Sequence, residues 1–393
     1  MSIALLVLGL VALISAWHVH HPVRRPGELA AALFASAWLA GELPFHVTAL
    51  FGGAGLALAL AGGLEEPSGW VGLGALILSG YGPLASWRDA RRTREALSAA
   101  LGKPVRGEAS WLRYLVPVHV ADRDVVATPG LVRENDRLKA DLYVPRAAAT
   151  GPRPLLIYVH GGGWVLGLRR WQGRLLIRRL VKAGWVAVSV QYRLSPWATW
   201  PTHIIDVKRS IAWARGMAPS WGVDPSRIAL SGNSAGGHLA ALAAFSVGYA
   251  PWQPGFEEED TAVAALVGWY GIYDLVAAVD GSPLWPHGGL RRLWRLLVMK
   301  RALATARDDY HLASPATHFG PHAPPTLLIH GALDTLVPVA SARAFAADCE
   351  RAVPGRVRYL EIPGAEHAFE VFYSRRAVDA VEAAAMWLED QGF

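Results

Sequence analysis

Long apolar runs fill the first 87 residues of the chain. The run Ile3–Trp17 is somewhat shorter than the roughly 20 residues that cross a bilayer as a helix. It has no basic start and no small-residue cleavage site, which favours an uncleaved anchor over a secretory signal. Leu29–Leu64 is too long for one perpendicular helix and predicts a kinked, tilted helix or a tight hairpin. With a final span at Gly69–Trp87, we expect three membrane spans, with four as the alternative.

Charged residues beside these runs predict an orientation across the membrane. Arg24 and Arg25 follow the first run, and further arginines follow the last one at positions 88, 91, 92 and 94. Three spans place both clusters on one side, and the positive-inside rule makes that side the cytoplasm. Four spans would separate the clusters. We therefore expect an integral protein of the inner or cell membrane with its C-terminal part in the cytoplasm.

From about Arg137 onward, strand-like runs alternate with segments of helical periodicity. Leu138–Val144 alternates polar and apolar residues with the period of two typical of a half-buried strand. Apolar runs predict further strands at Leu155–His160, Trp185–Tyr192, Arg227–Ser231, Val263–Tyr270, Thr326–His330 and Val357–Ile362. Segments between them predict helices at Arg169–Lys182, His203–Met217, Ser234–Val247, Ser341–Arg351 and Arg375–Glu389. This alternation predicts an α/β domain, with a mostly parallel sheet and helices on both faces.

The chain accordingly divides into three regions. Residues 1–87 form a membrane-spanning helical region of about three helices. Residues 88–136 carry mixed charge and several prolines, and we interpret them as a linker with an element that leads into the next domain. Residues 137–393 form the α/β domain, since their length suffices for one such domain.

Composition restricts the partners that the chain can have. Hydrophobic residues make up 52% and charged residues 18% of the chain, a balance too apolar for an ordinary soluble protein. The net charge of +6 comes from arginine clusters around apolar segments, which favours anionic lipid head groups over nucleic acid. The single cysteine, Cys349, excludes a disulfide framework and a thiolate zinc site. His18, His20 and His21 have no acidic or thiol neighbour, so we expect no metal there.

The segment Ile228–Leu242 places one serine where a strand-like run becomes a helix-like run. Its centre, Gly232-Asn233-Ser234-Ala235-Gly236, matches the Gly-x-Ser-x-Gly pattern of a nucleophile elbow. The sharp turn needs small residues at positions 232 and 236, because side chains there would collide with the strand and the helix. The helix that begins beside Ser234 directs free N–H groups and its positive dipole end toward the serine. Ser234 is therefore the candidate nucleophile.

A serine hydroxyl needs a base, and the base needs a carboxylate that orients it. On this type of sheet the acid and then the histidine follow the serine in sequence. Asp334 lies just after the predicted strand Thr326–His330, and His367 just after Val357–Ile362. Because sites of open parallel sheets form at the carboxyl ends of strands, we expect both at one edge with Ser234. Alone, Asp334 is as readily a turn residue and His367 a structural histidine, but the ordered set favours catalysis. We assign structural roles to the nearby His238, His330 and Glu366.

The glycines after the predicted strand Leu155–His160 supply hydrogen-bond donors for an oxyanion. Consecutive glycines in His160-Gly161-Gly162-Gly163-Trp164 leave backbone N–H groups unobstructed. The candidate oxyanion hole consists of the N–H groups of Gly162, Gly163 and Ala235. The supporting motif positions are His160, Gly161, Gly232 and Gly236.

Together these motifs resemble the hormone-sensitive-lipase-like carboxylesterases of the α/β-hydrolase fold. The matching pieces stand in that family's order: HGGGW at 160–164, YRLSP at 192–196, GNSAGG at 232–237, HGALDTLVP at 330–338 and GAEHAF at 364–369. The resemblance covers about residues 137–393 and implies a Ser234–His367–Asp334 triad. The N-terminal layout is similar to that of actinobacterial membrane-anchored esterases.

Two features depart from the family pattern. Asn233 stands where many relatives have an aspartate, at a variable position that bears on selectivity rather than on catalysis. The membrane region occupies the place where soluble relatives carry a cap, so the insertion at 271–323 is a candidate cover for the pocket. Within it, Gly288–Ala304 has an apolar stripe at helical spacing surrounded by basic residues. We expect this helix to pack as a cap, with contact to a membrane surface as the alternative.

The sequence therefore predicts a membrane-anchored serine hydrolase, a carboxylesterase or lipase that cleaves apolar acyl esters through an acyl-enzyme. This chemistry requires no metal and no organic cofactor. The expected partners are a small-molecule or lipid ester and membrane lipids, and not nucleic acid. Two alternatives stay open: an acyltransferase that uses the same acyl-enzyme, and a noncatalytic membrane-tethered binding module. The filled triad positions argue against the binding module.

Overall fold

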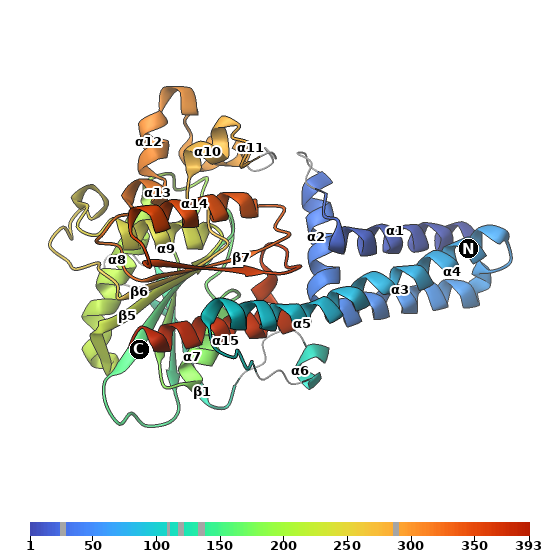
Figure 1. Cartoon of the computed structure of the whole chain (residues 1–393), viewed down its shortest axis with the longest axis horizontal. Coiled ribbons are helices and arrows are strands. Elements are labelled where there is room, and N and C mark those ends of the chain that lie inside the picture. The colour runs from blue at the N-terminus through green and yellow to red at the C-terminus, as the bar shows by residue number, and fades with distance from the viewer. Residues whose placement is uncertain (24–28, 108–110, 117–121, 133–137, 286–290) are drawn as a thin grey trace. The chain divides into compact units, whose positions relative to one another are not determined.

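The computed structural model describes the chain apart from residues 24–28, 108–110, 117–121, 133–137 and 286–290 (Figure 1). The chain forms two compact units. The first unit comprises Met1–His119, Gly331–Leu336 and Glu361–Ala380, and the second comprises Val120–His330, Val337–Leu360 and Val381–Phe393. Two short segments of the C-terminal half therefore belong to the same unit as the N-terminal helices.

Helices make up most of the first unit. They are α1 (Ser2–His20), α2 (Leu29–Glu42), α3 (Pro44–Leu58) with its π-helical continuation η1 (Ala59–Gly63), α4 (Pro67–Ser79), α5 (Tyr81–Leu101) and α6 (Trp111–Leu115). Pro44 begins α3, because proline is tolerated in the first turn of a helix but not in its interior. It therefore divides the predicted run Leu29–Leu64 into two helices. Among the described residues, two helices are long and apolar enough to cross a bilayer, Ser2–His20 and Pro44–Gly63.

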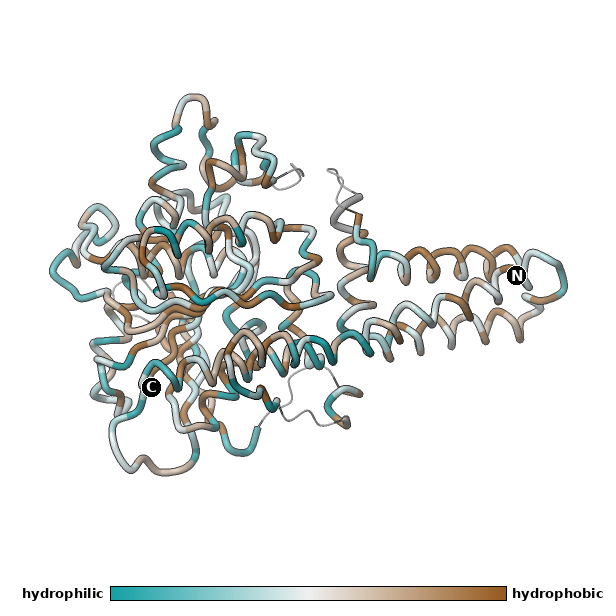
Figure 2. Tube along the Cα trace, in the orientation of Figure 1, coloured by the Kyte–Doolittle hydropathy of each residue, from teal (hydrophilic) through white to brown (hydrophobic). Residues whose placement is uncertain are grey.

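Glycines allow α1 and α4 to approach each other closely. A Cβ atom at Gly9 would overlap the backbone of Gly72, and one at Gly72 would overlap the backbone of Leu5. Small residues of this kind are typical of helices that pack against each other in an apolar environment. Figure 1 shows α1, α3 and α4 side by side, and Figure 2 shows that hydrophobic positions recur along α1 and α4.

The predicted third span has different limits in the structure. Gly69–Trp87 covers α4 and only the beginning of α5, which continues to Leu101 beyond the predicted boundary at residue 87. The alanine, arginine and leucine residues of this continuation are strong helix formers. Gly102 ends α5 in the left-handed conformation, with φ +70°. Arg24 and Arg25, on which the predicted orientation depends, lie outside the described residues.

In the described part of the chain, an eight-stranded sheet has the order β1-β2-β4-β3-β5-β6-β7-β8. The strands are β1 (Val125–Val132), β2 (Lys139–Pro145), β3 (Arg153–Val159), β4 (Val186–Val190), β5 (Val223–Asn233), β6 (Ala265–Trp269), β7 (Thr326–Gly331) and β8 (Val357–Ile362). β2 is antiparallel to both β1 and β4, whereas β4, β3, β5, β6 and β7 are mutually parallel. The predicted mostly parallel sheet is confirmed.

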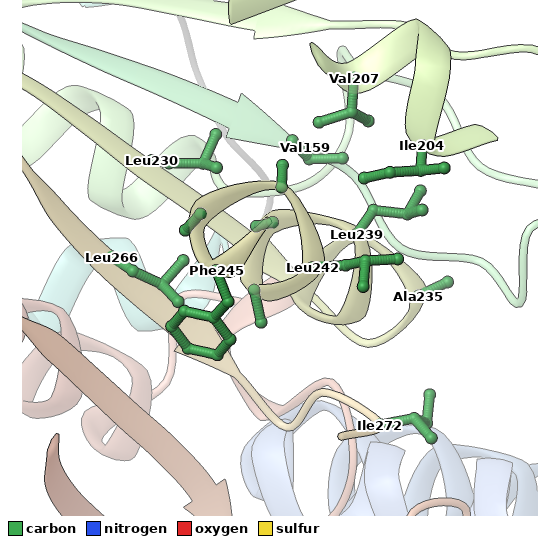
Figure 3. Close-up of a cluster of buried hydrophobic side chains, with 14 of the residues drawn as sticks. Val159, Ile204, Val207, Leu230, Ala235, Leu239, Leu242, Phe245, Leu266 and Ile272 are labelled. Atoms are coloured by element: carbon green, nitrogen blue, oxygen red, sulfur yellow. The ribbon is translucent and has the colours of Figure 1, made fainter. Parts of the chain in front are cut away.

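Helices on both faces cover this sheet. The longer ones are α7 (Arg174–Lys182), α8 (Thr202–Met217), α9 (Ala235–Phe245), α14 (Val339–Ala352) and α15 (Arg375–Asp390). Figure 1 shows α8 and α9 on one face and α7 on the other. Every residue of α9 is buried, as expected for a helix that is apolar on all sides. Figure 3 shows Leu239, Leu242 and Phe245 of α9 among side chains from β3, β5, β6 and α8.

The sequence pattern did not reveal β1. This strand lies within the predicted linker 88–136 and contains Pro129 and Gly130, which interrupt a strand pattern. Its register with β2 shifts between Thr128 and Leu131. Such an irregularity is typical of an edge strand, where proline and bulges are tolerated.

The insertion 271–323 also differs from the prediction. Instead of one helix over Gly288–Ala304, the described residues form α11 (Arg291–Leu293), the π-helical η4 (Trp294–Met299) and η5 (Leu303–Thr305). Lys300 adopts a left-handed conformation, with φ +51°, and interrupts the helix. Residues 286–290 lie outside the described part of the chain. The predicted amphipathic helix is therefore wrong in its extent.

Candidate active site

Ser234 lies at the junction where β5 ends at Asn233 and α9 begins at Ala235. Its backbone angles, φ 53° and ψ −121°, are unfavourable for a residue with a side chain. A Cβ atom at Gly232 would overlap the backbone of Gly236, and one at Gly236 would overlap carbonyl oxygens at the end of β3. The turn therefore requires glycine on both sides of the serine, and it presents Ser234 at the N-terminus of a buried helix.

The glycine loop after β3 has an unusual backbone. Gly162 and Gly163 have φ values of +122° and +61°, which glycine adopts readily. The Gly161 N–H donates hydrogen bonds to Asn233 Oδ1 at 2.7 Å and to Gln172 Oε1 at 2.6 Å. Since the Gly161 donor is engaged, the loop's candidate donors for an oxyanion are the N–H groups of Gly162 and Gly163.

Asn233 connects this loop to the elbow. Its side-chain oxygen accepts from Gly161, and its amide nitrogen donates to Tyr270 Oη at 3.0 Å. The sequence pattern marks position 233 only as variable, so its positioning role was not predicted. One feature of the sequence could have indicated this role. Asn233 is a polar residue directly before the nucleophile, in a turn whose other positions are mostly glycine or alanine.

His160 is a neutral structural histidine. Its Nδ1–H donates to Gly161 O at 2.8 Å, so its Nε2 accepts from the Gln191 amide at 2.8 Å. The ring stacks on Tyr192, with centroids 4.5 Å apart. Burial lowers the pKa of His160 to about 4, because the charged form loses its hydration. This histidine supports the first residue of the glycine loop.

Asp334 and His367 form a hydrogen-bonded pair in the first unit. His367 Nδ1 lies 2.7 Å from Asp334 Oδ2, and both side chains are buried. Asp334 follows β7 and His367 follows β8, which are neighbours in the sheet order. Asp334 Oδ1 also accepts from the Leu336 N–H at 3.0 Å. The carboxylate fixes the ring orientation and keeps the proton on Nδ1, so that Nε2 is the basic nitrogen.

Glu366 joins the two loops that carry this pair. Its Oε1 accepts from the backbone N–H and hydroxyl of Thr335, at 2.6 and 2.8 Å, and from the His367 N–H at 3.1 Å. Burial, and then the neighbouring charge of Asp334, raise the pKa of Glu366 to about 8. The side chain is therefore a neutral acid at neutral pH, and it holds the Asp334 and His367 loops together.

The two histidines to which we assigned structural roles donate hydrogen bonds to backbone carbonyls. His238 Nε2 lies 2.7 Å from Ala313 O, and His330 Nε2 lies 2.8 Å from Val337 O. Both side chains are buried. Among the described residues, no group of three or more histidine, cysteine or acidic side chains is arranged to hold a metal ion.

The predicted site residues thus form two groups. Asp334 and His367 meet in the first unit, whereas Ser234, Ala235 and the glycine loop lie in the second. Within the second unit, a Cβ atom at Gly161 would lie 3.0 Å from Ser234 Cβ, so the glycine loop adjoins the serine.

Comparisons with known proteins identify relatives of this chain. The sequence model of the family BD-FAE matches residues 140–348, more than half of the chain. The chain is 40% identical over 246 residues to the probable carboxylic ester hydrolase LipM of Mycobacterium tuberculosis, which covers 63% of this chain and 56% of LipM. It is 41% identical over 249 residues to esterase LipQ of the same organism, over 63% of this chain and 58% of LipQ. The chain thus spans somewhat more than half the length of these curated relatives.

Solved structures share the fold. Esterase 2 of Thermogutta terrifontis, phosphoramylated by tabun, superposes with a TM-score of 0.55 at 25% identity, covering 69% of this chain and 96% of that one. A truncated carbohydrate esterase from gut microbiota superposes with a TM-score of 0.57 at 23% identity, covering 68% and 96%. The predicted α/β-hydrolase fold is confirmed.

Proposed function

Because the chain belongs to the BD-FAE family, among the hormone-sensitive-lipase-like carboxylesterases, we propose that it is a serine hydrolase that cleaves carboxylic esters. The observation that carries the proposal is the buried hydrogen bond of 2.7 Å between His367 and Asp334. This hydrogen bond orients the His367 imidazole, so that it can act as the base that a serine nucleophile needs. The strained backbone of Ser234 supports the proposal, because such strain is concentrated at functional sites. The relatives LipM, a probable carboxylic ester hydrolase, and LipQ, an esterase, agree with it.

In the proposed first half-reaction, Ser234 attacks the ester carbonyl while His367 Nε2 takes the hydroxyl proton. Asp334 stabilises the imidazolium that forms and holds its orientation. The N–H groups of Gly162, Gly163 and Ala235 donate to the tetrahedral oxyanion. The carbon–oxygen bond to the alcohol then breaks, His367 gives its proton to the leaving oxygen, and an acyl-Ser234 ester remains.

The second half-reaction uses the same groups. His367 removes a proton from water, which attacks the acyl carbonyl, and a second tetrahedral oxyanion forms. Its collapse breaks the bond to Ser234 Oγ, returns the proton to the serine and releases the carboxylic acid. An alcohol in place of water would give a new ester, which is the acyltransferase alternative.

Residues 1–87 are proposed to anchor the enzyme in the cell membrane, with the hydrolase domain in the cytoplasm. The apolar helix Pro44–Gly63 supports this, because Leu50, Leu56 and Leu60 are 71%, 62% and 81% exposed. Exposed leucines on an apolar helix are unfavourable in water and suit contact with lipid chains. An apolar acyl ester, present in or near the bilayer, is the substrate class that fits this location.

Hydrolysis of a nitrophenyl ester series from acetate to palmitate, in detergent, tests the proposed function. Ser234→Ala should lower kcat by at least about a thousandfold, because the covalent route is lost. Ser226→Ala, at an exposed serine of the same strand, is the matched control and should keep wild-type activity. Full activity of Ser234→Ala would contradict the proposal. Product analysis with added alcohol separates hydrolysis from acyl transfer.

A further inference from the structure

Helix α2 packs directly against the loop that carries His367. The Trp38 Nε1–H donates a hydrogen bond to Ala368 O at 3.0 Å. The Trp38 ring packs on Phe372 with centroids 4.7 Å apart, and the Phe34 ring meets the His367 ring edge-on at 6.4 Å. Phe34 and Trp38 are four positions apart, so both project from one face of α2. All of these residues belong to the first unit.

The backbone immediately after His367 needs such support. Ala368 has φ +59°, in the left-handed region that residues with a Cβ atom seldom occupy. A backbone conformation of this kind persists only where its surroundings enforce it. The carbonyl that Trp38 holds belongs to this residue. The hydrogen bond therefore restrains the peptide group that joins Ala368 to Phe369, one residue after His367.

Arg376, in the first turn of α15 directly after the same loop, contacts α2. Its guanidinium donates to Gly41 O at 3.2 Å and lies 3.5 Å from the carboxylate of Glu42. Both charged side chains are buried, and a buried ion pair constrains geometry because separating the partners is costly. Helix α2 thus holds the His367 loop at two points, through Trp38 and through Arg376.

We propose that Trp38 is a positioning residue for His367 and that α2 is a functional part of the active site. This inference rests on the proposed serine hydrolase function. Trp38 fixes the loop from which the imidazole projects, and Phe34 excludes water beside the ring. Exclusion of water strengthens the interaction between the histidine and Asp334. The N-terminal helical region therefore contributes to turnover, independently of its attachment to lipid.

Trp38→Phe tests the proposal, because phenylalanine keeps an aromatic ring against Phe372 and removes only the donor to Ala368 O. Loss of this partly buried hydrogen bond, which orients the loop of the base, should lower kcat about fivefold and leave KM within about twofold. The rate of labelling of Ser234 by a fluorophosphonate should fall by the same factor, since labelling needs the same base. The matched control is Trp70→Phe, at an exposed tryptophan of α4, which should leave both rates unchanged.

The outcomes separate the two proposals. A lower kcat and labelling rate with an unchanged unfolding temperature would support the positioning role. Wild-type rates in Trp38→Phe, or an equal loss in Trp70→Phe, would overturn it while leaving the esterase proposal intact. If Trp38→Phe does not fold, Phe34→Leu decides: a lower labelling rate supports the role of α2, and a wild-type rate overturns it. Failure of the wild-type protein to hydrolyse esters would overturn the proposed function itself.

Discussion

At the residue scale, the environment of Glu366 makes it a buried acid beside a second acid. The side chain is enclosed, so it cannot relieve its repulsion from Asp334 by moving into solvent, and it keeps a proton instead. Its Oε2 has no hydrogen-bond partner among the described residues. A neutral Glu366 is therefore stable in a buried position where its carboxylate would be unfavourable. This position is directly beside Asp334 and His367, the acid and the base of the proposed mechanism.

Glu366 should make stability depend on pH. Its pKa in the folded protein, about 8, lies above the ordinary value of 4.5, so the folded state binds the proton more tightly than the unfolded state. The contribution of Glu366 to the free energy of unfolding therefore falls as pH rises from about 4.5 to about 8. Glu366→Gln keeps the Oε1 acceptor and removes the titration, so the unfolding temperature of the variant should rise relative to that of the wild-type protein as pH increases through this window. Thermal unfolding across the window measures the difference.

The matched control for this experiment is Glu258→Gln, at an exposed glutamate. Its pH profile should run parallel to that of the wild-type protein. Parallel profiles for Glu366→Gln and wild type would show that Glu366 does not titrate in the window.

Local motifs account for what the sequence predicted at this scale. Ser234, Asp334 and His367 each stand in a short segment whose glycines and position after a strand mark it. Trp38 carries no such mark, because its partner Ala368 lies 330 positions away. A contact across that distance depends on tertiary packing, and no local pattern in α2 indicates it.

At the element scale, the sequence pattern predicted segments with a regular apolar period, and it missed or misjudged segments that proline, glycine or a left-handed residue interrupts. Strand β8 has its predicted limits, and α15 extends one residue beyond the predicted helix. β1 was missed because proline and glycine interrupt it. The predicted helix Gly288–Ala304 was too long. The apolar periodicity continues past Lys300, but the left-handed conformation of Lys300 interrupts the helix there. Tertiary packing decides such segments.

The contact between α1 and α4 should be sensitive to added volume at one glycine. Gly72→Ala places a Cβ atom against the backbone of Leu5, which cannot move aside as a side chain can. The helices must separate, and the cost of overpacking is about 1–3 kcal/mol. Gly74→Ala is the control, because its added Cβ would have no atom of another described segment within 4 Å. Thermal unfolding in detergent should show a lower midpoint for Gly72→Ala alone. Equal midpoints would contradict the close packing.

At the scale of the whole molecule, the division into units cuts across the chain order. The loops of Asp334 and His367 belong with the N-terminal helices, while Ser234 belongs with most of the sheet. The predicted boundaries at 87 and 136 follow composition. They cannot reveal such an assignment, since residues 331–336 and 361–380 look like ordinary parts of an α/β domain. The domain limits, membrane spans and orientation stay predictions.

The orientation predicts which loops face the cell exterior. With three spans and a cytoplasmic hydrolase domain, the acidic turn at Glu65 and Glu66 lies outside and Lys103 inside. Since the single native cysteine, Cys349, is buried, cysteines introduced at Glu66 or Lys103 can be labelled selectively. A membrane-impermeant maleimide on intact cells should label Glu66→Cys and not Lys103→Cys. The reverse pattern, or labelling of both, would reject this topology.

The long separation between Trp38 and Ala368 also has a consequence for the timing of synthesis. The N-terminal helices and the Ser234 elbow leave the ribosome well before the His367 loop and α15. On the proposed mechanism, a growing chain therefore carries the nucleophile without its base. Contacts this distant in sequence form late, after the cost of closing a long loop has been met. On the proposed mechanism and membrane attachment, ester hydrolysis then begins only after the His367 loop has been made, so shorter chains would be inactive toward the lipids around them.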